Sequence, residues 1–348
     1  MSERIVKAGA HPDRRRILSL VAEGALTAQE ASLLLRGAAE ADARPAAPGS
    51  GPLAIAVVGM AARLADADGL DAVWAMLRDG RSAICPLPAA RRGPAMTGRL
   101  PRAGFLPDPE AFDAGFFRIS PTEAALMDPQ QRLFLEQAYH ALEDAGLGGE
   151  ALSEARCGVY VGAGSGDFSE VLKARGVSGN PLALMGNVPS ILAARISYFL
   201  NLKGPSLAVD TACSSSLTAL GLAVEALRAG TVDVALAGGV CVISTPEFMA
   251  SMAAGGMLSP TDACHTFDRA ADGFVCGEGA VALVLKTLDR ALADGDRIHG
   301  VVRALGSNQD GRTNGITAPS GTAQQALEED VYRRCDIDPR GIGYVESH

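Results

Sequence analysis

Short apolar runs alternate with amphipathic stretches along most of the chain after residue 52. Residues 157–162 form an apolar run bounded by polar and turn residues, which predicts a buried strand. Residues 128–145 place apolar side chains at helical spacing, with Pro129 near the start and Gly146 after the end, which predicts an amphipathic helix.

The same reasoning predicts the remaining elements. The other predicted strands are 53–58 (ending at Gly59), 206–209, 232–238, 280–285, 298–306 and 342–345. The other predicted helices are 70–77, 187–200, 214–229, 287–293 and 321–335, and segment 80–120 is expected to form a loop layer rich in Pro, Gly and Arg. Strands that alternate with helices in this way indicate an α/β sheet covered on both faces.

The first 52 residues have a different pattern. Apolar residues at helical spacing in 14–22, a Thr27–Glu30 capping box and Leu33–Leu35 predict a small helical hairpin within residues 1–38. Residues 39–52 are rich in Ala, Pro, Gly and Ser and read as a linker. Two interpretations of the hairpin stay open, a docking element for a partner and a leader that is only partly helical.

Composition narrows the class of protein. A chain of 348 residues with 48% hydrophobic and 20% charged residues is not disordered over most of its length. A net charge of −9 argues against non-specific binding of nucleic acid or of an anionic membrane surface. The N-terminus lacks the apolar core of a signal peptide, and the seven cysteines contain no Cys-x-x-Cys pair. These features predict a soluble, cytoplasmic protein.

The candidate chemistry is sharpest at Cys213, between a predicted strand that ends at Val209 and a helix that starts at or just after Cys213. Free backbone N–H groups at a helix start favour a thiolate and can bind an oxyanion when a thioester is attacked. A strained strand-to-helix turn is also how a nucleophile elbow presents its side chain. From spacing alone, a structural cysteine before a Ser-rich helix cap remains the alternative.

Other candidates carry weaker signals. Cys264-His265 and Cys276 lack the paired spacing of metal ligands, and Gly162–Gly166 lacks the spacing of a dinucleotide-binding loop. His348 follows a predicted strand at its carboxyl end, where α/β folds place functional groups, although position alone also fits a terminal residue without a role. The other cysteines, in apolar or loop contexts, read as core or incidental residues: Cys85, Cys157, Cys241 and Cys335.

The segment Asp210–Ser216 closely resembles the active-site motif of β-ketoacyl synthases, in particular the ketosynthase domains of modular polyketide synthases. Further motifs that resemble this family follow in order over residues 53–348. They are Val58–Met60 with Arg63, Phe112-Asp113, Phe116–Pro121, Met127–Arg132, Leu258–Pro260, Phe267-Asp268, Ala271–Phe274, Gly277–Gly279, Asn308–Gly315 and Val345–His348.

The resemblance implies a thiolase-like α/β fold, present here as the N-terminal half plus the beginning of the second half. Residues 53–297 would be the N-terminal domain and 298–348 the start of a truncated C-terminal domain. It also implies that Cys213 is the nucleophile, with its amide in the oxyanion hole, and that His348 is the first catalytic histidine. No metal or redox cofactor is implied, because the substrates travel on the phosphopantetheine arm of an acyl carrier protein.

The resemblance further implies a homodimer when the enzyme is complete, and the leader resembles segments that contact other polyketide synthase modules. The family's lysine, second histidine and second oxyanion loop lie downstream of His348 in the family pattern. We therefore expect a chain-extending synthase that does not condense ketides as this chain alone. The alternatives are a discrete synthase of fatty-acid elongation and an inactive fragment that acts only as an interaction module.

Overall fold

The computed structural model describes residues 27, 53–91, 102–148, 152, 154–177 and 179–348. The chain divides into two units, Met1–Gly51 and Pro52–His348, and all the described helices and strands belong to the second. The helical hairpin and linker predicted before residue 53 lie outside the described residues, apart from Thr27.

Among the described residues, seven strands form one mixed sheet in the order β2-β1-β8-β7-β5-β6, with β9 also paired to β1. Neighbours β7, β5 and β6 are parallel, whereas β8 runs antiparallel to both β7 and β1. The carboxyl ends of the three parallel strands therefore share one edge with the amino end of β8. The strands are β1 (Ile55–Leu64), β2 (Ala67–Asp68), β5 (Cys157–Gly162), β6 (Ser206–Val209), β7 (Val234–Cys241), β8 (Gly279–Thr287) and β9 (Gly300–Val302).

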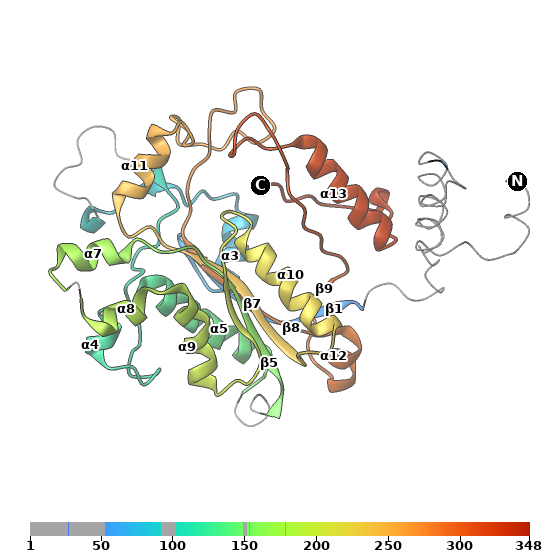
Figure 1. Cartoon of the computed structure of the whole chain (residues 1–348), viewed down its shortest axis with the longest axis horizontal. Helices are drawn as coiled ribbons and strands as arrows, with labels where there is room; N and C mark the ends of the chain where they lie inside the picture. Colours follow the sequence, from blue (N-terminus) through green and yellow to red (C-terminus); the bar gives the residue numbers. More distant parts are fainter. Residues whose placement is uncertain (1–26, 28–52, 92–101, 149–151, 153, 178) are drawn as a thin grey trace, which may run out of the picture. The chain divides into compact units, whose positions relative to one another are not determined.

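Helices cover both faces of the sheet, α5 (Pro129–Asp144) and α9 (Pro189–Leu200) on one and α10 (Ser215–Arg228) on the other (Figure 1). The period of two along the strands explains this division. In β5, Val159 and Val161 pack in the core beneath α5, whereas Tyr160 between them packs against α10. Both faces of the central strands are thus buried, as their continuous apolar runs predicted.

The remaining described elements connect or flank these layers. The helices are α3 (Leu70–Arg78), α4 (Pro121–Ala124), α7 (Phe168–Ala174), α8 (Pro181–Asn187), α11 (Pro246–Ala254), α12 (Leu288–Asp294) and α13 (Gly321–Arg334). The described part of the chain also has two 3₁₀ turns, η3 (Ala89–Arg91) and η4 (Pro339–Gly341), and a small second sheet of β3 (Cys85–Pro86) with β4 (Arg102–Ala103).

Most predicted elements are confirmed within one or two residues. The predicted strands 157–162 and 206–209 match β5 and β6 in both ends. The predicted helix 128–145 is α5, with the Asp128 carboxylate accepting a hydrogen bond from Gln130 N as its N-cap and Pro129 in its first turn. Gly146 follows with a φ of 65°, the left-handed conformation that ends a helix.

The strand predicted at 232–238 is β7 and runs on to Cys241, and the strand predicted at 298–306 is β9 and spans only Gly300–Val302. Two further boundaries are wrong for local reasons. The first strand does not end at Gly59 but continues to Leu64, because this glycine serves close packing: a Cβ there would lie 2.3 Å from the Ala141 carbonyl oxygen of α5. The predicted helix 187–200 is split, because Pro189 forces Val188 into an extended conformation that separates α8 from α9.

The predicted strand 342–345 is also wrong. Its residues have irregular backbone and are exposed, with Tyr344 at 77% and Val345 at 73%. A strand requires a hydrogen-bonded neighbour, and none of the described strands pairs with this segment.

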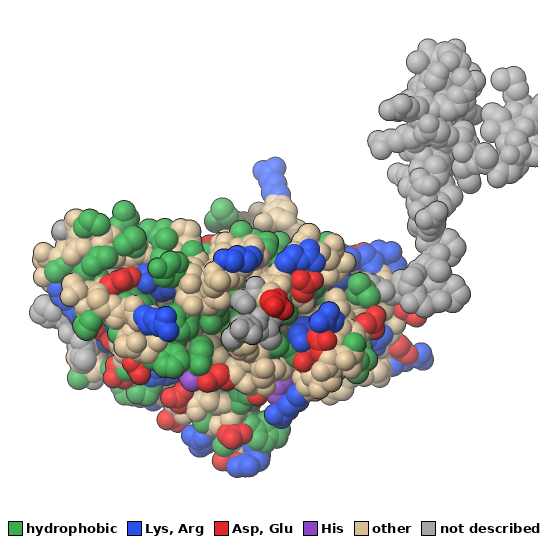
Figure 2. All heavy atoms as spheres, turned by 90° about the horizontal axis from the view of Figure 1, so that it is seen from below, with side chains coloured by type: hydrophobic (Ala, Val, Ile, Leu, Met, Phe, Trp, Pro, Cys, Tyr) green, Lys and Arg blue, Asp and Glu red, His purple; other side chains and the backbone are tan. Residues whose placement is uncertain are grey.

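Within the described part of the chain, no single helix has the length and hydropathy needed to cross a membrane. Helices α8 and α9 would qualify by length and composition only as a pair, and they are bent by 91°. Exposed apolar side chains do occur on α8, at Leu184 and Met185. Figure 2 shows apolar side chains gathered towards the left of the face seen from below, with charges of both signs interspersed on the right.

Candidate active site

The turn that carries Cys213 is a strained elbow between β6 and α10. Ala212 has a φ of 56°, a left-handed conformation that is uncommon for a residue with a side chain. Cys213 forms a bridge with Thr211, and α10 begins two residues later at Ser215. The elbow predicted from the sequence is therefore present, with the strain at the residue before the cysteine.

Short side chains within the motif hold this turn. Ser215 Oγ donates to the Ala212 carbonyl at 2.6 Å and accepts from Thr211 N at 2.8 Å. The Asp210 carboxylate accepts from Ala212 N at 3.0 Å, and Ser214 Oγ donates to the Thr211 carbonyl at 2.9 Å. The side chains of Asp210, Thr211, Ser214 and Ser215 all take part in hydrogen bonds of this turn, so the Cys213 side chain is not needed to hold it.

Two glycines allow α10 to approach the sheet edge closely. A Cβ at Gly162, the last residue of β5, would lie 2.4 Å from Ser215 C and Ser216 N. A Cβ at Gly239 of β7 would lie 2.7 Å from the Ser216 Cβ. Backbone cannot yield as a flexible side chain would, so both positions must lack a side chain for the elbow to keep its place.

We therefore expect Gly162→Ala to displace the start of α10, to lower the rate at which a thioester acylates Cys213, and to destabilise the fold by ~1–3 kcal/mol through overpacking. Gly164→Ala is the matched control, because its Cβ would meet its nearest atom, Asp210 Oδ2, at an ordinary 3.6 Å. Acylation kinetics and urea midpoints of the two variants measure the difference, and equal behaviour would contradict the assigned packing.

Cys213 and Cys264 are exposed free cysteines, and Cys276 is a half-buried one. Burial, followed by the thiolates of Cys213 and Cys264, raises the pKa of Cys276 to about 11. At neutral pH Cys276 is therefore a neutral thiol, which is a weak nucleophile toward a thioester.

A buried carboxylate fastens the loops at the same edge of the sheet. The Glu278 side chain is fully buried and pairs with Arg91 at 2.5 Å. Its two oxygens also accept from Leu106 N at 2.8 Å and Ile243 N at 2.9 Å. No role for Glu278 was predicted from the sequence; of the two glycines beside it, Gly279 has no room for a side chain, since a Cβ there would lie 2.7 Å from Leu64 Cδ2, whereas Gly277 faces open space.

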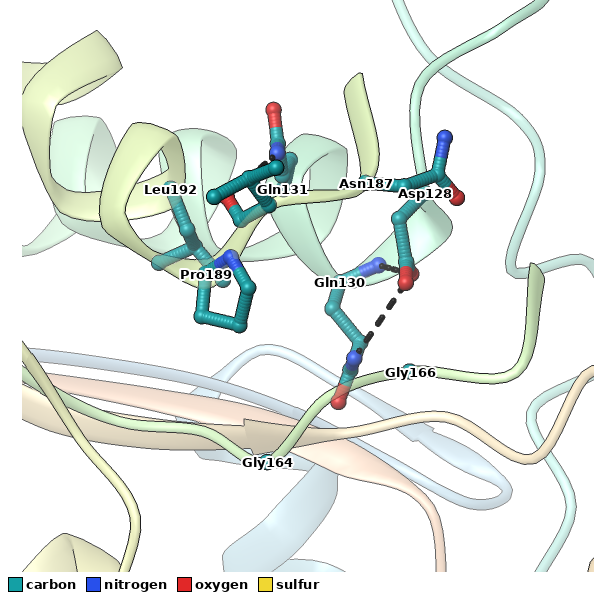
Figure 3. A pocket seen from close by; sticks show the side chains of 9 residues that line it. Asp128, Gln130, Gln131, Gly164, Gly166, Asn187, Pro189 and Leu192 are labelled. Atoms are coloured by element: carbon teal, nitrogen blue, oxygen red, sulfur yellow. Dashed lines mark hydrogen bonds between the residues drawn. The ribbon is translucent and has the colours of Figure 1, made fainter. Parts of the chain in front are cut away.

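A cavity of about 10 Å³, room for roughly one water-sized group, lies between α5, the loop after β5 and the α8–α9 junction (Figure 3). Cys213 does not line it. In Figure 3 the Gln130 amide reaches from Asp128 toward the loop that carries Gly164 and Gly166. A Cβ at Gly166 would lie 2.0 Å from Asp128 Oδ2, so the loop packs directly on this carboxyl group.

Burial raises the pKa of Asp128 from its usual 3.8 to about 6, with the nearby Asp167 carboxylate adding to the rise and the Gln130 hydrogen bonds opposing it. A raised pKa means that the folded state binds this proton more tightly than the unfolded state. The stability it contributes is therefore fully present below pH ~3.8 and is lost as pH rises through about 6, with a total of ~3 kcal/mol.

Asp128→Asn removes this titration while its amide oxygen still caps α5. We expect the unfolding free energy of the wild type to fall relative to that of the variant between pH 4 and 7, by up to ~3 kcal/mol. Urea titrations at several pH values measure this difference. Asp71→Asn, on exposed α3 surface, is expected to follow the wild type; a pH-independent gap between wild type and Asp128→Asn would refute the titration of this residue.

His348, the second predicted site residue, ends an exposed irregular segment rather than a strand. No hydrogen bond or ion pair places it against Cys213 in the described structure. The described structure therefore supports the predicted elbow at Cys213 and shows no contact between it and His348.

Comparison with known proteins gives matches over nearly all of the described unit. Residues 53–291 match the model of the β-ketoacyl synthase N-terminal domain and 299–348 that of its C-terminal domain. Polyketide synthase ThaG of Burkholderia thailandensis is 47% identical over 299 residues, covering 84% of this chain and 5% of that protein. Polyketide synthase PksL of Bacillus subtilis is 47% identical over 305 residues, covering 85% of this chain and 7% of that protein.

Solved structures show the same relationship. The ketosynthase from module 6 of the bacillaene synthase of Bacillus subtilis 168 superposes with a TM-score of 0.78 at 47% identity, covering 84% of this chain and 50% of that one. The oxazolomycin ketosynthase domain OzmH KS7 of Streptomyces albus superposes with a TM-score of 0.78 at 39% identity. This chain thus spans about half the length of the solved ketosynthases and less than a tenth of ThaG or PksL.

Proposed function

The chain belongs to the β-ketoacyl synthase family and has its thiolase-like α/β fold, and on that premise we propose that it is a chain-extending ketosynthase of a polyketide synthase. In this proposal Cys213 accepts an acyl group from the phosphopantetheine arm of a carrier protein. Decarboxylative condensation with a malonyl-type extender follows. The high identity to polyketide synthases favours this function over discrete fatty-acid elongation and over a purely structural role.

The observation that carries the proposal is the elbow that holds Cys213. The strained Ala212 and the hydrogen bonds of Ser214 and Ser215 present the exposed Cys213 just before the first turn of a 14-residue helix. Attack of this sulfur on a thioester forms a tetrahedral oxyanion, and the Cys213 amide at the helix start is a donor for that charge. Collapse of the oxyanion expels the carrier thiol and leaves the acyl group on Cys213.

Condensation would use a second carrier arm. Loss of carbon dioxide from a malonyl group leaves an enolate, which attacks the acyl-Cys213 thioester and frees the sulfur. We assign His348 the role of stabilising the charge of this step. His348 is exposed in irregular backbone, so the role requires the terminal segment to bring the imidazole to the substrate.

The proposed partners follow from this chemistry. An acyl carrier protein supplies both arms, a second copy of the complete enzyme forms the homodimer, and residues 1–38 contact other synthase modules. The domain boundary belongs near residue 298, and a reducing cytoplasm suits a chain whose seven cysteines are all free.

The acyl-transfer half of the proposal is tested by incubating the chain with an acyl group on carrier-protein phosphopantetheine. We expect the acyl group to leave the carrier and to appear on the chain, as followed by intact mass spectrometry of both proteins. A folded chain that takes no acyl group from the carrier would overturn the proposal. Acyl-Cys213 without ketide after addition of malonyl carrier would instead limit the chain to the first half-reaction.

A further inference from the structure

The loop that joins β9 to α13 carries an asparagine followed directly by a glycine, Asn314-Gly315. Both residues are exposed and have irregular backbone. Of the five asparagines in the chain, Asn314 is the one that precedes a glycine. The side-chain carbonyl carbon of an asparagine and the next backbone nitrogen can close a five-membered ring, so such a pair is a candidate for covalent self-modification.

The two reacting groups are free in this loop. Within the described residues, no hydrogen bond engages the Asn314 side chain or the Gly315 N–H group. The Gly315 carbonyl, by contrast, accepts from Thr313 Oγ1 at 2.6 Å and from Ala318 N at 2.9 Å. These bonds hold Gly315 by its carbonyl and leave its nitrogen available to the Asn314 side chain.

The space around Gly315 is open. A Cβ at this position would meet no atom within 4 Å, and Gly315 does not have a positive φ. Neither packing nor backbone conformation therefore requires a glycine here. Nothing hinders the approach of the Gly315 nitrogen, and a side chain can be added at this position without a clash.

Two of the other asparagines are followed by a nitrogen that cannot react. Pro181 follows Asn180 and has no N–H group. Leu202 follows Asn201 and donates its N–H to the Ser197 carbonyl at 2.9 Å.

The remaining two are held by their side-chain amides. Asn187 Nδ2 donates to the carbonyls of Leu126 at 3.0 Å and Ala183 at 2.7 Å. Asn308 is exposed in the same loop as Asn314, but its Nδ2 donates to the Ala323 carbonyl at 2.7 Å, and the residue that follows it is a glutamine. The structure thus protects four asparagines and leaves one unprotected.

We propose that Asn314 is a site of spontaneous deamidation in the folded chain. The Gly315 nitrogen attacks the side-chain carbonyl carbon of Asn314, so that a new C–N bond forms and the C–N bond of the side-chain amide breaks. Ammonia leaves with the proton of the Gly315 nitrogen, and a succinimide ring remains. Water then opens the ring at either carbonyl and gives aspartate or isoaspartate. No electrons are transferred, and water is the one co-reactant.

The reaction changes both the charge and the backbone of the loop. Either product carries a carboxylate in place of a neutral amide, which makes the net charge one unit more negative than −9. Isoaspartate also lengthens the main chain by one carbon. The change falls within Asn308–Gly315, one of the segments that resemble β-ketoacyl synthases.

The test incubates the full chain at mildly alkaline pH, which favours loss of the attacking nitrogen's proton, and maps its peptides at intervals. We expect the peptide that contains Asn314 to gain about 1 Da and to divide into aspartate and isoaspartate forms. A protein isoaspartyl methyltransferase with a labelled methyl donor identifies the isoaspartate form. Asn308 is the internal control and should keep its amide over the same period.

Gly315→Val is the matched variant, because its branched side chain shields the nitrogen at a position with room for a Cβ. We expect the mass gain at Asn314 to be lost in this variant, with an unchanged circular dichroism melt. Equal rates in wild type and Gly315→Val would overturn the proposal. So would a folded wild type that keeps the Asn314 amide while its urea-unfolded form loses it. The peptide map is read without acyl transfer, so this result is separate from the outcome for the proposed function.

Discussion

Cys213→Ala abolishes covalent acylation of the chain, from about one acyl group per folded chain to none. The reason is chemical, because a thioester intermediate needs a nucleophilic sulfur at the elbow and alanine offers none. The fold should survive the change, since the turn is held by the side chains of Asp210, Ser214 and Ser215 and not by the cysteine. Tandem mass spectrometry after incubation with an acyl-pantetheine thioester measures the acyl group at each cysteine.

Cys264→Ala is the control for exposure. Cys264 is also an exposed free thiol, but it lies in a loop and not at a helix start. The Cys264→Ala variant should retain acylation at the level of the wild type. A circular dichroism melt verifies that both variants are folded. Equal acyl incorporation by Cys213→Ala and by the wild type would remove Cys213 as the nucleophile.

Glu278→Gln is expected to destabilise the fold by about 3–5 kcal/mol, because it leaves the Arg91 guanidinium partly buried without a charged partner. The amide also turns one of two acceptors into a donor, so either Leu106 N or Ile243 N faces another N–H group. Chemical denaturation measures the change in unfolding free energy. The rate of Cys213 acylation should fall together with the stability, because the Glu278 carboxylate fixes the loops at that edge of the sheet.

Glu225→Gln provides the matched comparison. Its carboxylate also pairs with an arginine, Arg228 at 3.1 Å, but the Glu225 side chain is 72% exposed. Water screens that pair, so we expect a change within about 0.5 kcal/mol. In a double-mutant cycle of Arg91→Ala and Glu278→Ala, the two losses should be far from additive, since each single change strands the other partner. Additive losses would show that the pair is not an energetic unit.

Local sequence patterns predicted most of the helices and strands. The strand 157–162 and the helix that begins at Pro129 were predicted because apolar spacing, proline and glycine act over a few residues. The strand predicted at 342–345 failed for the complementary reason. A run of β-forming residues favours an extended backbone. A strand exists only where a neighbouring strand supplies hydrogen bonds, and the run itself does not specify that neighbour.

The sequence by itself determined the alternation of strands and helices, the family resemblance and Cys213 as the candidate nucleophile, since each can be recognised in short contiguous segments. Only the tertiary structure decided that Glu278 pairs with Arg91 across 187 positions and that Gly166 packs on the Asp128 carboxyl. These meetings depend on strand order and on which edge of the sheet each loop leaves. Such contacts form only when the chain closes long loops around one core, and the local spacing of apolar residues does not specify them.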